Sequence, residues 1–221
     1  MVKHNFEELF HKRQGSIKPG LDRIRKAYET LQRPADDAFN VLVAGTNGKG
    51  GTSGFLWMLL ASSQQVGLFT SPHLRSFAER FQVSGMSLGE EDVYNSWKNL
   101  AGLLTESYDE LSFFELSTLI AFDLFETSQT SCNIFEVGLG GRLDSTNVVE
   151  PSLSIVTSIS RDHEEFLGSD LIHILKEKLG ICRVGIPLFW GNSGEVLLTS
   201  DYQEHIISFA KEKKNTVVYD G

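Results

Sequence analysis

The chain has 221 residues, 41% of them hydrophobic, and a formal charge of -9 at pH 7. This length and apolar content suit one globular α/β domain with a well-filled core, and they argue against a disordered chain. Because the net charge is negative and the sequence contains no block of Lys or Arg residues, a nucleic-acid partner is not expected.

The two cysteines, Cys132 and Cys182, lie far apart in apolar stretches and lack the C-x-x-C spacing of a zinc or redox site. Buried reduced thiols are therefore expected, which favours a cytoplasmic protein. The N-terminal residues contain no long apolar segment, and no stretch approaches the ~20 apolar residues of a membrane span. We expect a chain with neither a targeting segment nor a membrane partner.

Apolar runs and helical spacing alternate along the chain. Residues 1–38 are predicted to form a helical segment, with a helix over 20–34 that leads into a strand at 39–45. Further strands are predicted at 66–71, 133–138, 153–158, 186–191 and 216–221, with a short strand and turn within 72–88. Helices are predicted at 49–63, 89–107, 114–128, 171–182 and 195–213. This order predicts an α/β fold with a mostly parallel sheet of six or more strands and helices on both faces.

A glycine-rich stretch, "VLVAGTNGKGGTS" (41–53), joins the first central strand to the next helix. Such a turn directs backbone N–H groups and the positive end of a helix dipole at one point, where a phosphate is stabilised. The strict G-x-x-x-x-G-K-[ST] pattern is not met, because Val43 and Gly50 stand at its first and last positions. The alternative is a glycine-rich turn with a solvated lysine. The candidate phosphate-binding residues are Gly45, Thr46, Asn47, Gly48, Lys49, Gly50, Gly51 and Thr52.

Polar side chains also follow three other predicted strands, in "TSPHL" (70–74), "FEVGLGGRLDSTN" (135–147) and "SISRDHEEFLG" (158–168). In a parallel sheet, ligands bind beyond the carboxyl ends of the strands. Glu136 lies within an apolar strand, where a carboxylate needs a positive partner. That partner is either a Mg²⁺ ion, with Ser71 as a further ligand, or an ion pair with Lys49 or Arg142.

Five stretches, "VAGTNGKG", "TSPHL", "FEVGLGGRLDSTN", "SISRDHEEFLG" and "KEKLGI", occur in the order and spacing of folylpolyglutamate synthase and dihydrofolate synthase. The chain thus resembles this family of the Mur ligase superfamily from about residue 18 to 215. The resemblance implies a P-loop NTPase-like fold in a ligase that phosphorylates a carboxylate with ATP, after which the amino group of glutamate attacks the acyl phosphate. Residues 1–221 would form the N-terminal ATP-binding domain, and the family's C-terminal glutamate-ligase domain is expected to be absent from this chain.

The resemblance also implies roles for single residues. Lys49 would hold phosphates, Ser71 and Glu136 would bind one Mg²⁺, and His163 would bind a second. Lys178 would carry a carbamate, although without the resemblance it reads as an exposed residue on a charged helix face. Lys49, His163 and Lys178 are thus the candidate catalytic residues. A folate or pteroate substrate would lie near 20–33, 73–80 and 113–115, and its candidate contacts are His73, Phe77, Phe113, Arg142 and Asp144.

Two positions depart from the family pattern. Gly51 stands where Ser or Thr is usual, and Leu179 stands where Ala is usual. A different Mur-type amino-acid ligase and a non-catalytic nucleotide-binding module are the alternative interpretations. For the leading interpretation, the expected ligands are ATP, two Mg²⁺ ions, glutamate and a folate or pteroate, bound by a monomer.

Overall fold

The structure, a computed structural model, describes residue 6 and residues 20–84, 86, 88–161, 170–191, 200–213 and 217–219. Its helices are α2 (Asp22–Thr30), α3 (Lys49–Leu60), α4 (Glu90–Leu104), α5 (Phe113–Thr127), α7 (Leu171–Leu179) and α8 (Ser200–Lys213). Its strands are β1 (Phe39–Ala44), β2 (Val66–Phe69), β3 (Phe81–Val83), β4 (Cys132–Glu136), β5 (Leu153–Val156), β6 (Leu188–Trp190) and β7 (Val217–Tyr219). Three short 3₁₀ helices are η1 (Phe77–Arg80), η2 (Thr105–Glu110) and η3 (Ser145–Val148).

The strands of the described residues form one seven-stranded sheet in the order β3-β2-β4-β1-β5-β6-β7. Only the β2–β3 pair is antiparallel, and the other neighbouring strands run parallel. The predicted mostly parallel α/β sheet is therefore confirmed. In this order β1 lies between β4 and β5, so the loops that follow these three strands open at the same edge of the sheet.

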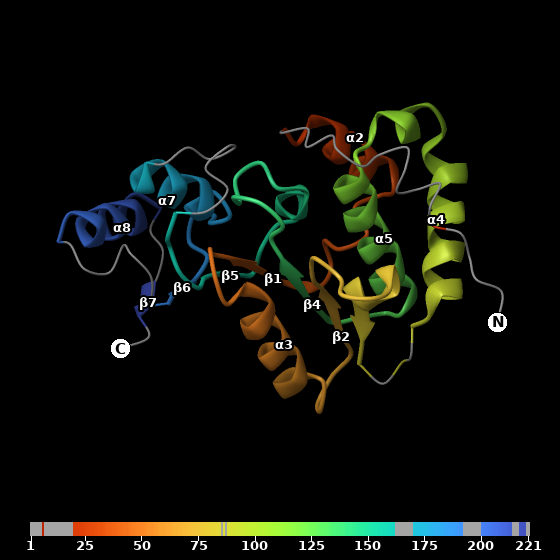
Figure 1. The fold of residues 1–221 in the computed structure, drawn as a ribbon, viewed down its shortest axis with the longest axis horizontal. Coiled ribbons are helices and arrows are strands. Elements are labelled where there is room, and N and C mark those ends of the chain that lie inside the picture. The colour runs from red at the N-terminus through yellow and green to blue at the C-terminus, as the bar shows by residue number, and fades with distance from the viewer. Residues whose placement is uncertain are drawn as a thin grey trace.

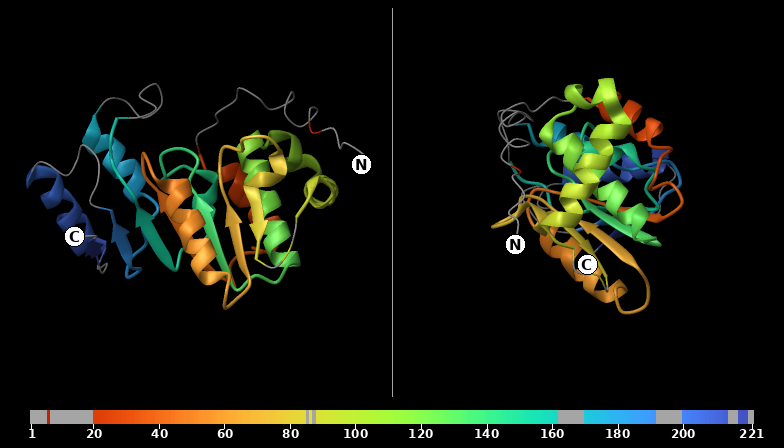
Figure 2. Two further views of the ribbon diagram at one scale, coloured as in Figure 1. Left: turned by 60° about the horizontal axis from the view of Figure 1, so that its bottom comes forward. Right: turned by 90° about the vertical axis from the view of Figure 1, so that its right-hand side faces the viewer.

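Helices cover both faces of the sheet, as predicted. Helix α3 lies against one face, while α5 lies against the other with α4 and α2 packed beyond it (Figures 1 and 2). The α3 side buries a small apolar cluster that includes Val41, Val43 and Ile134. The larger core lies on the α5 side, where Phe122 and Phe135 pack with their ring centroids 5.3 Å apart.

Within the described residues the predicted helices are present, but their ends differ by a few residues. Residues 1–5 and 7–19 of the predicted segment 1–38, and residues 195–199 of the helix predicted at 195–213, lie outside the described residues. The helix predicted over 20–34 ends at Thr30, because Gln32 and Arg33 take positive φ angles of 62° and 59°. Helix α5 begins at Phe113 because the Ser112 hydroxyl accepts the Glu115 N–H, and the Glu115 carboxylate accepts the Ser112 N–H at 2.7 Å. Local hydrogen bonds of this kind set helix ends within a periodic pattern.

Helix α3 is apolar on its outer face as well as on the face that meets the sheet. Phe55, Met58 and Leu59 are 67%, 57% and 73% exposed, and their spacing places them on one stripe of the helix. Even so, none of the helices in the described part of the chain has the length and apolarity needed to cross a membrane.

Candidate functional site

The glycine-rich loop between β1 and α3 is held by the segment that follows β5. The Thr46 N–H donates to the Ser158 carbonyl at 2.8 Å, and the Asn47 N–H donates to the Ser158 hydroxyl at 2.9 Å. Gly45 has a φ of +146°, and a Cβ atom there would lie 1.9 Å from the Thr157 hydroxyl oxygen. Only glycine fits at this position, so the loop and residues 157–160 form one rigid unit.

The loop meets the N-terminus of α3, as predicted. Gly48 caps the helix in the left-handed conformation with a φ of +85°, and Lys49 is the first helical residue. Gly48, Gly50 and Gly51 are exposed. The unpaired N–H groups of a first helical turn favour a bound anion, which is the physical basis of a phosphate site here.

Two lysine ammonium groups converge on this loop from distant parts of the chain. The Lys49 Nζ donates to the carbonyl oxygens of Gly45 at 3.0 Å and Thr46 at 3.1 Å. The Lys178 Nζ, which α7 supplies, donates to the same Gly45 carbonyl at 2.9 Å. Lys178 is only 3% exposed, so its interpretation as an exposed residue on a charged helix face is wrong. The two cations create a positively charged site beside the phosphate loop.

Glu136 ends β4 next to the same loop and is only 5% exposed. Its carboxylate accepts the Ser71 N–H at 2.9 Å. Burial raises the pKa of Glu136, although the Ser71 and Gly50 N–H groups and the charges of Lys49 and Arg80 oppose that rise. A carboxylate whose charged form is disfavoured in this way would gain from a bound cation.

The close approach of Glu136 also explains why glycine follows Lys49. A Cβ atom at Gly50 would lie 3.3 Å and 3.4 Å from the two carboxylate oxygens of Glu136. A larger side chain at residue 50 would push against the carboxylate. Around Gly51, in contrast, no atom lies within 4 Å of the position that a Cβ would take. The two neighbouring glycines thus differ, since only a Cβ at residue 50 would crowd a neighbouring group.

The ion-pair alternative for Glu136 is not formed by Arg142, whose guanidinium group instead contacts Glu177 at 2.8 Å. A metal site remains a prediction. The described residues contain no cluster of three His, Cys, Asp or Glu side chains placed to hold a metal ion. Mg²⁺, however, is commonly held by one or two carboxylates together with phosphate oxygens and waters. The donors Glu136 and Ser71 beside the phosphate loop fit that pattern, whereas His163 lies outside the described residues.

The three segments predicted to surround an acid substrate do come together. Arg23 of α2 forms an ion pair with Glu115 of α5 at 3.2 Å. The Phe77 and Phe113 rings lie 5.5 Å apart, and the Arg80 guanidinium group lies over both of them. Phe77 is only 3% exposed and belongs to the core, whereas Phe113 is partly buried. Their roles toward a substrate remain predictions.

Arg80 is a residue of this region that sequence reasoning missed. It is only 7% exposed, and its Nε donates to the His73 Nδ1 at 2.9 Å. Burial lowers the pKa of Arg80 to about 10, although the charge of Glu136 favours its charged form. Burial, and then the charge of Arg80, lower the pKa of His73. The "TSPHL" stretch gave a signal for His73, but no local pattern marked Arg80 as buried.

Asp144 organises the loop that follows β4. Its Oδ2 accepts the N–H groups of Gly138 and Leu139 at 3.0 Å and 2.9 Å, and its Oδ1 accepts the N–H and the hydroxyl of Thr146 at 3.0 Å and 2.6 Å. Burial raises the pKa of Asp144, and these donors oppose the rise. Because protein donors occupy both oxygens, the structure gives Asp144 an architectural task whatever its role toward a substrate.

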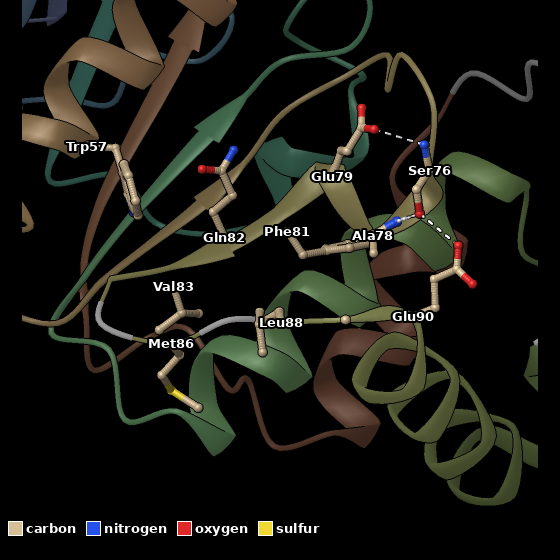
Figure 3. Close-up of a pocket in the computed structure, with 11 residues that line it drawn as sticks. Trp57, Ser76, Ala78, Glu79, Phe81, Gln82, Val83, Met86, Leu88 and Glu90 are labelled. Carbon is tan, nitrogen blue, oxygen red and sulfur yellow. Dashed lines mark hydrogen bonds between the residues drawn. The ribbon is translucent and has the colours of Figure 1, made fainter. Parts of the chain in front are cut away.

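A groove of about 500 Å³ lies along β3 and the start of α4, away from the phosphate loop (Figure 3). Trp57, Phe81, Met86 and Leu88 are among the residues that line it, and the Ser76 hydroxyl donates to Glu90 at its rim at 3.0 Å. None of the described candidate residues for phosphate, metal or substrate lines this groove, although Ser76, Ala78 and Glu79 of the predicted substrate segment 73–80 do. The convergence of charged groups on the phosphate loop, rather than this groove, therefore defines the candidate site.

The chain is similar to characterised proteins, although no family model matches it. It is 42% identical over 179 residues to the dihydrofolate synthase/folylpolyglutamate synthase of Buchnera aphidicola, covering 80% of this chain and 41% of that protein. The structure of Escherichia coli FolC in complex with DHPP and ADP matches with a TM-score of 0.84 and 35% identity, over 97% of this chain and 50% of that one.

A further solved structure, a bifunctional folylpolyglutamate synthase/dihydrofolate synthase with Mn, AMPPNP and L-glutamate bound, matches with a TM-score of 0.79 and 34% identity. That match covers 93% of this chain and 49% of the other. The chain spans about half the length of these solved structures and somewhat less of the curated relative.

Proposed function

We propose, on the premise that this chain belongs to the dihydrofolate synthase/folylpolyglutamate synthase family, that it supplies the ATP-binding part of a folate–glutamate ligase. The reaction would join L-glutamate to a folate-type acid, either dihydropteroate or a tetrahydrofolate polyglutamate, through an acyl phosphate. Residues 1–221 would form the ATP-binding domain, with 1–38 leading into it. The glutamate-ligase domain would belong to the part of the relatives that this chain does not span.

The observation that carries this proposal is the meeting of Lys49, Lys178 and Glu136 at one loop. Lys49 is the first residue of α3, Lys178 comes from α7, and Glu136 ends β4. Lys49 beside a helix N-terminus suits a polyphosphate, whereas Lys178, once converted to a carbamate, would be an anionic ligand for a metal ion. A buried carboxylate alongside them would oppose that anion unless a metal ion lay between the two. Phosphates and a divalent cation together satisfy all of these groups.

In the proposed complex, residues 45–52 would hold the ATP phosphates at the N-terminus of α3, and Lys49 would exchange its carbonyl partners for phosphate oxygens. Glu136 and Ser71 would hold one Mg²⁺. We further propose a second Mg²⁺, held with the help of His163 and a carbamate on Lys178. When bound, these ions supply positive charge to the transferred phosphoryl group, which is the main requirement of phosphoryl transfer. The relatives crystallised with Mn and with AMPPNP or ADP support this assignment.

For the acid substrate we propose the region where α2, residues 73–80 and the start of α5 meet. His73, Phe77 and Phe113 lie together there, and a pterin ring would extend their ring contacts. Arg142 and Asp144 are further candidate contacts of the acid substrate. The Arg142 side chain already binds Glu177, and the Asp144 side chain already binds the 138–146 loop. The relatives with bound DHPP and L-glutamate support a folate-type acid and glutamate as the two substrates. We propose a cytoplasmic monomer as the working form.

The phosphate site is tested by titrating Mg-ATP into the chain and into Lys49→Ala by calorimetry. We expect binding to be lost in Lys49→Ala, because it removes a charge placed at the phosphates. Lys176→Ala is the matched control, because Lys176 is an exposed lysine on α7. Unchanged affinity in Lys49→Ala, or no binding by the wild-type chain, would overturn the phosphate-loop assignment.

The ligase reaction is tested with the complete gene product that contains this chain. Dihydropteroate or a reduced folate is supplied with ATP and glutamate, and ADP and the glutamylated product are measured. Product with dihydropteroate indicates addition of a first glutamate, and product with a reduced folate indicates chain extension. If ADP forms with neither acid, the other Mur-type ligase interpretation replaces this one.

A further inference from the structure

We infer that Arg142 is a positioning residue: together with Gly180 it locks the last turn of α7 to the loop after β4, and this lock places Lys178 at the phosphate loop. The lock comprises Gly141, Arg142, Asn147, Glu177 and Gly180. The inference rests on the proposed function only in giving Lys178 a task at that site.

Backbone and amide hydrogen bonds form the first part of the lock. The Arg142 N–H donates to the Glu177 carbonyl at 2.8 Å. The Asn147 side-chain amide donates both to the Arg142 carbonyl at 3.0 Å and to the Gly180 carbonyl at 3.1 Å. The last carbonyl groups of a helix have no partner within the helix. The loop after β4 therefore donates to the Gly180 carbonyl just past α7, and it adds a second donor to the Glu177 carbonyl, which also accepts the Gly180 N–H at 3.2 Å.

The side chains of Arg142 and Glu177 form the second part. The Arg142 Nε and Nη2 atoms both donate to the Glu177 Oε1, at 2.9 Å and 2.8 Å. The Glu177 side chain is 10% exposed and that of Arg142 is 54% exposed, so water screens the cation more than the carboxylate. A guanidinium group at a helix C-terminus is also favoured by the helix dipole. The ion pair with Glu177 and the helix dipole both hold Arg142 against the turn that carries Lys178.

Two glycines, Gly141 and Gly180, form the third part. Because they lack a Cβ atom, the loop after β4 and the end of α7 can come into direct contact. A Cβ at Gly141 would lie 2.8 Å from the Glu177 carbonyl oxygen. A Cβ at Gly180 would lie 2.3 Å from the Arg142 Cβ and 2.6 Å from its Cα. Gly180 has a φ of -60°, which any residue adopts, so close packing rather than backbone conformation requires glycine there.

Lys178 depends on this lock because it lies between Glu177 and the locked Gly180. Its Nζ reaches the Gly45 carbonyl at 2.9 Å from a side chain that is almost fully buried. The loop after β4 begins just after Glu136. This one segment therefore connects the Glu136 carboxylate with the helix end that carries Lys178. A small movement of a catalytic group costs much of its effect, so a rigid support is needed.

The test measures how fast acetic anhydride modifies each lysine of the chain, with mass spectrometry as the readout. Lys176 is an exposed residue of the same helix and serves as the internal reference for the buried Lys178. In Arg142→Gln we expect the ratio of the Lys178 rate to the Lys176 rate to rise about fivefold. In Arg142→Lys, which keeps a positive charge, we expect this ratio to lie between the Arg142→Gln value and the wild-type value. In Gly180→Ala we expect a larger rise, because the added methyl forces the segments apart.

Gly102→Ala is the matched control, since it adds the same methyl in α4, where nothing lies within 4 Å of the new atom. Its ratio should equal that of the wild-type chain. A residue with a merely structural role would lower the denaturation midpoint and leave the ratio unchanged in the folded state. Should Gly180→Ala fail to fold, Arg142→Gln decides alone.

An unchanged ratio in folded Arg142→Gln overturns the lock. This outcome is distinct from failure of the proposed function, in which the wild-type chain would not bind Mg-ATP while the labelling ratios behaved as expected.

Discussion

At the scale of single residues, the two glycines after Lys49 are not equivalent. Gly50 lies against the Glu136 carboxylate, whereas the space around Gly51 is open. The sequence marked Gly51 as the departure from its family pattern, and the structure shows that packing does not account for it. We see no structural reason for glycine at this position.

Gly51→Ser is expected to raise the affinity for Mg-ATP by about three- to tenfold, the effect of one added hydrogen bond. The new Cβ atom meets no atom within 4 Å, and it lies in the first turn of α3, where the N–H groups and the added hydroxyl would face the proposed phosphate. Calorimetry measures the change. Gly51→Ala is the control, because it gains helix stability, roughly 1 kcal/mol, without adding a hydroxyl. Equal affinities in the two variants would contradict a role for the hydroxyl.

Glu136→Gln is expected to stabilise the nucleotide-free chain near neutral pH and to weaken Mg-ATP binding. Burial raises the pKa of Glu136, so the folded chain binds the proton more tightly than the unfolded chain. Stability from this group is therefore present below the unfolded pKa and is lost as pH rises through the folded pKa. Thermal melts between pH 4 and 8 measure this, and each 1 kcal/mol shifts Tm by about 2–4 °C. A Tm for Glu136→Gln below that of the wild-type chain at pH 7 would contradict the predicted stabilisation.

At the scale of elements, the loop between β1 and α3 depends on β5 as much as on its own glycines. The Thr157 and Ser158 side chains both donate to the Asn47 carbonyl, at 2.7 Å and 3.0 Å. The sequence placed polar residues after both strands, and the parallel pairing of β1 with β5 brings those ends together. The shape of the loop is therefore a property of two elements.

Gly45→Ala is expected to destabilise the chain by more than about 2 kcal/mol and to abolish Mg-ATP binding. A methyl there would meet the Thr157 hydroxyl oxygen at 1.9 Å in an unfavourable backbone conformation. Urea denaturation measures the effect. Gly54→Ala in α3 is the control, because nothing lies within 4 Å of its new atom, and it should stabilise the chain by up to about 1 kcal/mol. A Gly45→Ala chain as stable as wild type would refute the packing argument.

Element types were more predictable than element ends. Nearly continuous apolar runs identified β1 and the other parallel strands, and apolar residues with a period of 3.6 identified α5 and the other α-helices. The 3₁₀ helices η1, η2 and η3 were not predicted. The end of α7 was not predicted, since helical spacing continues to Cys182 while the helix stops at Leu179. Contacts with Arg142 and Asn147 occur at that end, and periodicity carries no information about them.

At the scale of the whole molecule, the two faces of the sheet differ. The α5 side holds the larger core beneath several helices (Figure 1), whereas on α3 the side chains of Phe55, Met58 and Leu59 are exposed. A contiguous exposed apolar stripe promotes association or dye binding in solution. Mutations on the outer side of α3 should therefore change how strongly the chain associates or binds a hydrophobic dye in solution.

The double variant Phe55→Ser, Leu59→Ser is expected to lower the binding of a hydrophobic fluorescent dye about twofold or more while changing Tm little, since both side chains are mostly exposed. Fluorescence titration and a thermal melt measure the two quantities. A matched pair of buried positions on the same face of the sheet, Val41→Ser and Ile134→Ser, should instead lower Tm strongly. A large fall in Tm for the Phe55 and Leu59 variant would mean that this stripe is packed in solution.

The sequence by itself determined the alternation of strands and helices, the parallel sheet and the edge of the sheet near which Lys49, Glu136 and Ser71 would be found. These conclusions follow from local periodicity and from the rule that parallel strands present their ends at one edge. Only the tertiary structure decided that Lys178 is buried at Gly45, that Arg142 pairs with Glu177 and that Arg80 supports His73. The physical reason is that burial and pairing of a charged side chain depend on neighbours from distant parts of the chain, which no local pattern encodes.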